Sequence, residues 1–244
     1  MRTWNSMKTS GAVLIATLLA AAQAQAIIAY NFPSGLVGNQ TVVTDPLILG
    51  NEFKVNSAIN VTAVGAFENG NGIFEAVIPV AIYNYSGGTW SQVAGTYTTF
   101  SGAVGTPNGS AKFQNLVAPV TLSPGTYAIV AANYGFATGE RNWNANETPG
   151  ANRATFQNSS TAISMDAAYT SFYATGTSLN PTLSGLSEGS WTGTWAAGTP
   201  TFAGATFEFT PVPEAAHFAM AGIGLLGLVY IGRYARMRRI MKFA

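Results

Sequence analysis

The chain has 244 residues, of which only 9% are charged and 48% are hydrophobic, and it contains no cysteine. An average soluble domain has about 25% charged residues. The lack of cysteine excludes disulfides within the chain, thiolate chemistry and cysteine-ligated metal sites. The single histidine, His217, lies in an apolar stretch near the C-terminus. Its position excludes a Ser-His-Asp triad or a histidine-rich zinc site in the middle of the chain.

Charge is segregated along the sequence. Residues 1–26 carry two bases and no acid, residues 27–213 carry four bases and nine acids, and residues 214–244 carry five bases and one acid. The net charges of these regions are therefore +2, −5 and +4. The acidic middle region has no basic stripe, so we expect no nucleic-acid partner.

The N-terminus has the parts of a secretory signal peptide. Basic residues precede the apolar run at 11–22, and small residues follow at Ala24 and Ala26, the two positions that signal peptidase recognises. We expect a signal helix that is cleaved after Ala26. The apolar run is shorter than the roughly 20 residues that span a bilayer, which disfavours an uncleaved anchor. Either Met1 or Met7 would begin such a signal.

The C-terminus carries an apolar segment followed by a basic cluster. Residues 215–232 have no formal charge, and this length is just enough to cross the bilayer core as a helix. A helix of a soluble domain would show a polar face, and this segment has almost none. Basic residues after an apolar span stay in the cytoplasm, and here they are Arg233, Arg236, Arg238 and Arg239. We therefore expect residues 27–213 to lie outside the cytoplasm.

Residues 212–239 resemble the PEP-CTERM sorting signal of Gram-negative bacteria. That signal combines a Pro-Glu-Pro motif, a transmembrane helix that is often rich in Gly and Leu, and a terminal arginine cluster. The matching parts here are Val212-Pro213-Glu214, the apolar span and the four arginines named above. The sequence departs from the family pattern at Ala215, where the second proline is expected.

The resemblance implies two processing partners, signal peptidase and an exosortase, which is a transpeptidase-like membrane enzyme that cleaves near the motif. Pro213 and Glu214 would be its recognition residues, and Ala215 leaves open whether the tail is cleaved or stays as an anchor. The implied location is the inner membrane, with the domain outside the cytoplasm, and after cleavage the cell surface or the extracellular space. Members of the family are commonly linked to exopolysaccharide and biofilm matrix, which implies a structural or adhesive role.

Residues 27–210 are expected to form one all-β domain of β-sandwich or jelly-roll type, between the signal peptide at 1–26 and the sorting tail at 211–244. Runs rich in Val, Ile, Thr, Tyr and Phe recur at roughly ten-residue spacing, separated by turn residues. Residues 47–134 are also similar to β-sandwich domains often found in PEP-CTERM proteins. The predicted strands are 27–32, 47–55, 58–67, 76–85, 90–93, 96–100, 111–117, 126–134, 151–156, 167–174 and 205–210.

Alternation and turn residues support this interpretation. In the strand at 205–210, Phe207 and Phe209 should point inward and Glu208 outward. Turns are expected at 69–72 and 86–88, where Asn-Gly and Gly-Gly tolerate positive φ angles, and at 123–125, where Pro and Gly stand together.

Carboxylates are the first candidates for chemistry. Glycoside hydrolysis needs two of them about 5–10 Å apart, and Glu140 and Glu147 form one such pair in the sequence. With nine acids in the region, we expect these two to lie in a solvated polar loop instead. Glu68 and Glu75 bracket the turn at 69–72 and would offer oxygen ligands to calcium. Because Asn-Gly is itself a turn signal, we expect a turn and no metal site.

Tryptophans are the second candidates. Trp143, Trp191 and Trp195 would stack on sugar rings if they were exposed, and Trp191 and Trp195 would share one face of a strand. Large aromatic residues dominate cores, so we expect these side chains to be buried. The sequence thus favours an exported protein that is not an enzyme and needs no cofactor. A carbohydrate-binding module is the alternative, and a glycoside hydrolase is the third hypothesis.

Overall fold

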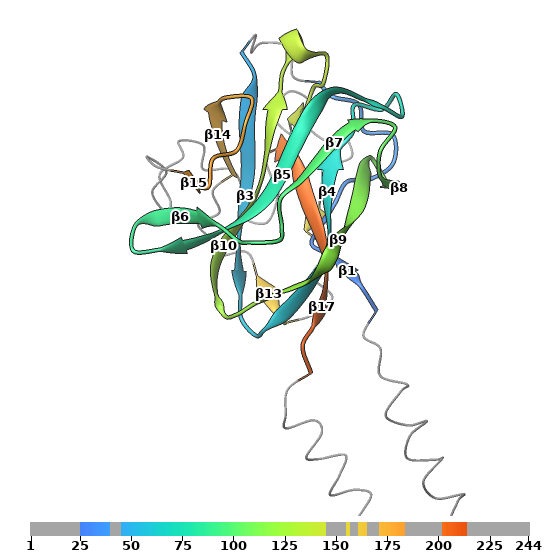
Figure 1. Cartoon of the computed structure of the whole chain (residues 1–244). Coiled ribbons are helices and arrows are strands. Elements are labelled where there is room, and N and C mark those ends of the chain that lie inside the picture. Colours follow the sequence, from blue (N-terminus) through green and yellow to red (C-terminus); the bar gives the residue numbers. More distant parts are fainter. Residues whose placement is uncertain are drawn as a thin grey trace, which may run out of the picture. The chain divides into compact units, whose positions relative to one another are not determined.

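The computed structural model describes residues 25–39, 45–144, 155–156, 161–164, 171–183 and 202–213. Within them the chain is all-β, with curled antiparallel sheets and one 3-10 turn, η1 (Phe136–Thr138) (Figure 1). The chain divides into two compact units, Met1–Pro211 and Val212–Ala244. Of the second unit only Val212 and Pro213 are described. The described ranges contain no helix that is long and apolar enough to cross a membrane, and the expected signal helix and C-terminal span lie outside them.

The larger sheet has eight strands in the order β13-β3-β10-β5-β6-β15, with β14 also paired to β3 and β7 to β5. All of its pairings are antiparallel. Its strands are β3 (Leu47–Val55), β5 (Phe74–Ser86), β6 (Thr89–Gln92), β7 (Thr98–Gly102), β10 (Gly125–Tyr134), β13 (Ile163–Ser164), β14 (Ser171–Thr175) and β15 (Thr182–Leu183).

The smaller sheet has five strands in the order β1-β17-β4-β9-β8. They are β1 (Ile27–Ile28), β17 (Ala205–Pro211), β4 (Ile59–Phe67), β9 (Ala111–Leu122) and β8 (Thr106–Asn108). Two short pairs complete the fold, namely β2 (Tyr30–Asn31) with β12 (Thr155–Phe156), and β11 (Trp143–Asn144) with β16 (Phe202–Ala203). Figure 1 shows β1 and β17 side by side, although they come from opposite ends of the domain.

The main core is built from the inward faces of both sheets. Alternate residues of β5, such as Ile78, Val80 and Ile82, join this core. Ala81 and Tyr83, which alternate with these residues along the strand, belong to a second cluster on the other side of the larger sheet. That cluster also contains Ala128, Val130 and Ala132 of β10, Trp90 of β6, and Leu179 and Leu183. The larger sheet is therefore covered on both faces at its centre, which explains why β5 and β10 are continuous apolar runs.

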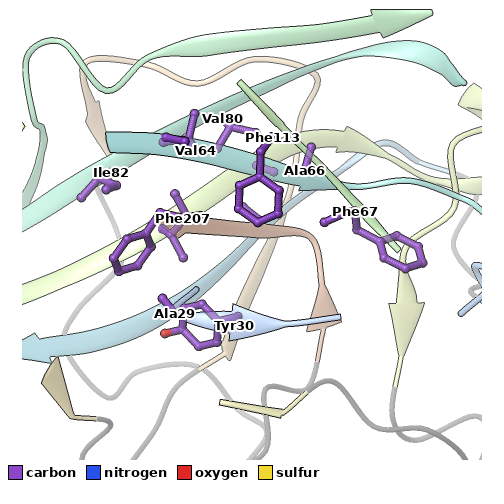
Figure 2. Packing of buried hydrophobic residues seen from close by; sticks show 14 of the residues in the cluster. Ala29, Tyr30, Val64, Ala66, Phe67, Val80, Ile82, Phe113 and Phe207 are labelled. Atoms are coloured by element: carbon purple, nitrogen blue, oxygen red, sulfur yellow. The ribbon is translucent and has the colours of Figure 1, made fainter. Parts of the chain in front are cut away.

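Aromatic rings at β17 join the two sheets. The Phe207 ring centroid lies 4.7 Å from that of Phe53 on β3 and 5.9 Å from that of Phe209. Tyr30 packs edge-on to Phe207 with a centroid distance of 6.4 Å, and Figure 2 shows the two rings next to each other. Phe207 and Phe209 are fully buried while Glu208 is half-buried, so the predicted alternation of this strand is confirmed.

Two buried tyrosine hydroxyls add polar contacts inside the core. The Tyr134 hydroxyl lies 2.8 Å from the carbonyl oxygen of Phe67 and 2.9 Å from that of Gly204. The Tyr30 hydroxyl donates to the carbonyl oxygen of Glu52 at 2.9 Å. Burial raises the pKa of both tyrosines well above the ordinary value, so both hydroxyls stay protonated and donate.

The strands predicted from the sequence agree with the structure at the centre of the domain and differ at its edges. The range 47–55 is reproduced as β3, while β9 runs five residues further than predicted, to Leu122. The turns at 69–72 and 86–88 are confirmed, and Gly87 and Gly88 both have positive φ at the tip of the β5–β6 hairpin. The expected turn at 123–125 connects the two sheets, with Gly125 as the first residue of β10.

Replacing Phe207 with alanine should destabilise the domain by about 3–5 kcal/mol, because the cavity would open between rings contributed by both sheets. Chemical denaturation of the purified protein measures this change. Tyr97→Ala is the control, because Tyr97 is half exposed and a surface truncation of this kind costs about 0.5 kcal/mol or less. Equal losses for the two variants would contradict the central role of Phe207.

Candidate functional site

The described residues gather carboxylates at one place, around the loop between β4 and β5 (residues 68–73, the β4–β5 loop). Glu68 and Glu75 stand at either side of this loop, and Glu140 approaches it from the segment that follows β10. We call these three residues the carboxylate cluster. Gly70 and Gly72 have φ angles of 89° and 85°, which a residue with a side chain rarely adopts, so the glycines permit the turn itself.

Glu140 is fully buried, and both of its carboxylate oxygens accept backbone hydrogen bonds. Oε1 accepts from the amide of Asn69 at 3.0 Å, and Oε2 accepts from the amide of Glu75 at 2.8 Å. One side chain therefore spans both ends of the β4–β5 loop. The expectation that Glu140 lies in a solvated polar loop is wrong, because its carboxylate serves as the partner of two backbone amides that are far away in sequence.

Glu68 and Glu75 also accept hydrogen bonds from groups of the β4–β5 loop. Oε1 of Glu68 accepts from the amides of Asn71 and Gly72, at 2.7 and 2.8 Å. Oε1 of Glu75 accepts from the Asn71 side chain at 2.8 Å. The turn interpretation of this stretch is thus supported by hydrogen bonds, in which one oxygen of each carboxylate accepts from the loop. In the part of the chain that the structure describes, no group of three or more acidic or histidine side chains could hold a metal ion.

Asn69 connects three separate segments at this site. Its side-chain oxygen accepts from the amide of Gly38 at 3.0 Å, and its side-chain nitrogen donates to the carbonyl of Gly139 at 3.1 Å. The approach at Gly38 is close, since a Cβ there would lie 2.4 Å from the carbonyl oxygen of Arg141. Only glycine allows the chain to pass at this distance.

Lys112 on β9 lies at the edge of the site. Its ammonium group donates to the carbonyl of Gly72 and lies 5.9 Å from the centre of the Phe74 ring. It therefore helps to hold the end of the β4–β5 loop against β5 and β9.

The pKa of Glu140 depends mostly on burial. Burial is the largest cause that raises this pKa to about 7; the amide hydrogen bonds from Glu75 and Asn69 act to lower it, and the nearby charges of Glu68 and Glu75 act to raise it. The charges of Glu140 and Glu68 also raise the pKa of the Tyr134 hydroxyl, in addition to the larger effect of its burial. Glu140 therefore changes its charge near neutral pH, where an ordinary glutamate is ionised.

This geometry does not suit Glu140 to catalysis on a bound glycan. A general acid or base must reach the substrate within hydrogen-bond distance, and Glu140 is enclosed with both oxygens engaged. Its proposed partner in a hydrolase pair, Glu147, lies outside the described residues. The site as described is a structural arrangement that ties loops together.

The structure describes only some of the other site residues that the sequence predicts. Ala26 is exposed just before β1, Val212 is half-buried and Pro213 is exposed just after β17. The backbone of Trp143 belongs to β11 and pairs with Ala203. The remaining predicted residues lie outside the described ranges: Ala24, Glu214, Trp191, Trp195, Arg233, Arg236, Arg238 and Arg239.

Comparison of the chain with models of protein families, with curated proteins and with solved structures finds no match.

The role of Asn69 predicts a difference between two neighbouring asparagines. Asn69→Ala removes hydrogen bonds to two distant segments and should destabilise the domain by about 1–3 kcal/mol. Asn71→Ala is the matched control, because among the described residues the Asn71 side chain bonds to Ile73 and Glu75, within or beside its own turn. We expect this control to lose about 1 kcal/mol or less. Denaturation of both variants tests the prediction, and a loss for Asn71→Ala as large as that for Asn69→Ala would contradict it.

Proposed function

We propose that this protein is an exported, membrane-tethered envelope or matrix protein whose C-terminal tail is a PEP-CTERM-type sorting signal. The observation that carries the proposal is the order of parts in the sequence. A basic start and an apolar run that ends in small residues precede an acidic region without cysteine, and Val212-Pro213-Glu214, an apolar stretch and an arginine cluster follow it. Each part alone is common, whereas their order at the end of the chain is specific.

The described fold supports this proposal through the positions at which the domain begins and ends. β1 starts at Ile27, the residue after the proposed signal-peptidase site, and β17 ends at Pro211, one residue before Val212. The two strands are paired, with Ile27 opposite Phe209. Cleavage after Ala26 and near Glu214 would therefore release a domain with all its described strands intact.

We assign the domain a β-sandwich architecture of jelly-roll type and a structural or adhesive role outside the cytoplasm, linked to exopolysaccharide. Three observations support a role in scaffolding over one in catalysis. The domain carries few charges for its length, the buried carboxylates of Glu68 and Glu140 bond to the protein's own amides, and Trp90 is buried in the second cluster. A role of this kind needs a stable exported domain and no cofactor.

Mass spectrometry of the protein purified from its native cells tests the proposal. We expect a chain that begins at Ile27 and ends near Pro213 or Glu214, because both cleavage points lie directly outside the terminal strands. Replacing Pro213 and Glu214 together by alanine should block the second cut and leave the arginine tail in place. Cleavage that is unchanged in this double variant would exclude recognition of the motif.

Retention of the arginine tail in the wild-type protein would contradict sorting and leave a membrane-anchored protein. Ala215→Pro separates two reasons for such a result, because it restores the family's second proline. Cleavage that appears only in this variant would assign the failure to residue 215. A chain that still carries residues 1–26 would contradict export by a cleaved signal peptide.

A further inference from the structure

The sequence contains three Asn-Gly pairs, and all of them lie in the part of the chain that the structure describes. They are Asn69-Gly70, Asn71-Gly72 and Asn108-Gly109. Glycine has no side chain to obstruct its backbone nitrogen, so this nitrogen can attack the side-chain amide of a preceding asparagine. The three pairs share this local chemistry, and their surroundings in the fold distinguish them.

The Asn69 side chain is held at both of its polar atoms. Its oxygen accepts from the amide of Gly38 at 3.0 Å, and its nitrogen donates to the carbonyl of Gly139 at 3.1 Å. The residue is also partly buried. Attack by the Gly70 nitrogen would require the Asn69 side chain to turn toward its own backbone, and this rotation would break both hydrogen bonds.

Asn71 is exposed, but hydrogen bonds engage both groups that would react there. Its side-chain oxygen accepts from the amide of Ile73 at 3.1 Å, and its side-chain nitrogen donates to the carboxylate of Glu75 at 2.8 Å. The amide of Gly72, which would be the nucleophile, donates to the carboxylate of Glu68 at 2.8 Å. Three hydrogen bonds therefore oppose the reaction at Asn71.

The pair Asn108-Gly109 lacks such restraints. Asn108 is exposed at the end of β8, and the hydrogen bonds of the described residues include none made by its side chain. They also include none donated by the Gly109 amide. Gly109 has a φ of 63° and begins the two-residue connection between β8 and β9. Among the described residues, both reacting groups therefore have no hydrogen-bond partner.

The turn that follows Asn108 is held firmly by a neighbouring segment. The Ser110 amide donates to the carbonyl of Phe32 at 2.9 Å, and the Ser110 hydroxyl donates to the carbonyl of Pro33 at 2.7 Å. A Cβ on Gly109 would lie 1.9 Å from the carbonyl oxygen of Phe32, so the glycine backbone is packed directly against this segment. The position of the Gly109 nitrogen is therefore fixed.

The strand that carries Asn108 is held much less firmly. β8 has three residues, all of them exposed, and it lies beside β9 at the end of the smaller sheet (Figure 1). Its middle residue, Pro107, has no amide hydrogen to donate. Short strands with exposed hydrogen bonds open at a low cost in free energy. Opening of β8 lets Asn108 rotate toward the Gly109 nitrogen, from which the extended strand conformation holds it away.

We propose that Asn108 is a site of spontaneous deamidation, in which opening of β8 brings its side-chain amide onto the Gly109 nitrogen. The nitrogen attacks Cγ of Asn108, a bond between them forms, the bond from Cγ to Nδ2 breaks, and ammonia leaves with the proton of the Gly109 amide. Water then adds to one of the two carbonyl carbons of the cyclic imide and opens the ring. The product is aspartate or isoaspartate at position 108, and nothing is oxidised or reduced.

The modification would act on β8 and leave the rest of the domain in place. It adds a negative charge at position 108, and the isoaspartate form also inserts one carbon atom into the backbone between residues 108 and 109. This insertion removes β8 from its register with β9. The hydrogen bonds of Ser110 lie beyond the change and are kept. The inference concerns the folded domain and does not depend on its export or on the processing of its tail.

Peptide mass spectrometry of the full-length protein, aged in mildly alkaline buffer, measures the conversion at each of the three pairs. We expect Asn108 to convert at least about tenfold faster than Asn69 or Asn71, which corresponds to about 1.4 kcal/mol of protection at the two held sites. The same chain aged in denaturant is the control. There the hydrogen bonds are absent, and the three rates should become similar.

The identity of the product tests the role of Gly109. Attack by its nitrogen yields isoaspartate together with aspartate, whereas direct hydrolysis of the side chain by water yields aspartate alone, and fragment masses distinguish the two. Asn108→Gln is the matched variant, because it keeps an exposed amide but would have to close a larger ring. This variant should show no conversion at position 108 and should unfold like the wild type.

Three results would overturn the proposal. The first is conversion of Asn69 or Asn71 in the folded protein as fast as that of Asn108. The second is aspartate without isoaspartate at position 108. The third is protection of Asn108 in the folded protein as strong as that of the other two asparagines, because β8 would then not open as the proposal requires.

Discussion

The position of β17 inside the smaller sheet is the constraint on which the rest of the domain depends. This strand comes last in the domain, yet it lies between β1 and β4. Phe207 packs against Phe53 of the larger sheet, while its carbonyl accepts from the amide of Ala29 at 2.9 Å. The Thr206 hydroxyl bonds to both the amide and the carbonyl of Tyr30. The first and last segments of the domain therefore stabilise each other, and we expect a fold closed by such distant contacts to need its last strand.

The carboxylate cluster also depends on contacts between distant parts of the chain. Segments that are far apart in sequence meet at the β4–β5 loop, and polar side chains take the place of a strand ladder between them. Glu140 accepts from the amides of Asn69 and Glu75. The Asn69 side chain bonds to the backbone of Gly38 and Gly139, in keeping with the need of buried polar groups for partners. The arrangement connects distant segments through side-chain hydrogen bonds, in a domain that is otherwise poor in charge.

Much of this fold was accessible from the sequence, because long strands have a pattern of their own. The alternation of Phe207 and Phe209 and the Gly-Gly tip of the β5–β6 hairpin encode local structure directly. Strands of two or three residues, such as β8 and β15, have no detectable period and form because a neighbouring strand offers partners. The burial of Glu140 was not predictable for a similar reason, since its partners Asn69 and Glu75 are 71 and 65 residues away and its sequence neighbours are polar.

The most direct test of this account is to compare two purified forms of the domain in denaturant, one ending at Pro213 and one ending at Gly204. The longer form contains β17, and it should unfold in a single cooperative transition. The shorter form lacks the partner of β1 and the Phe207 ring, and it should show no cooperative transition. A shorter form that unfolds as cooperatively as the longer one would contradict the claim that the last strand closes the fold.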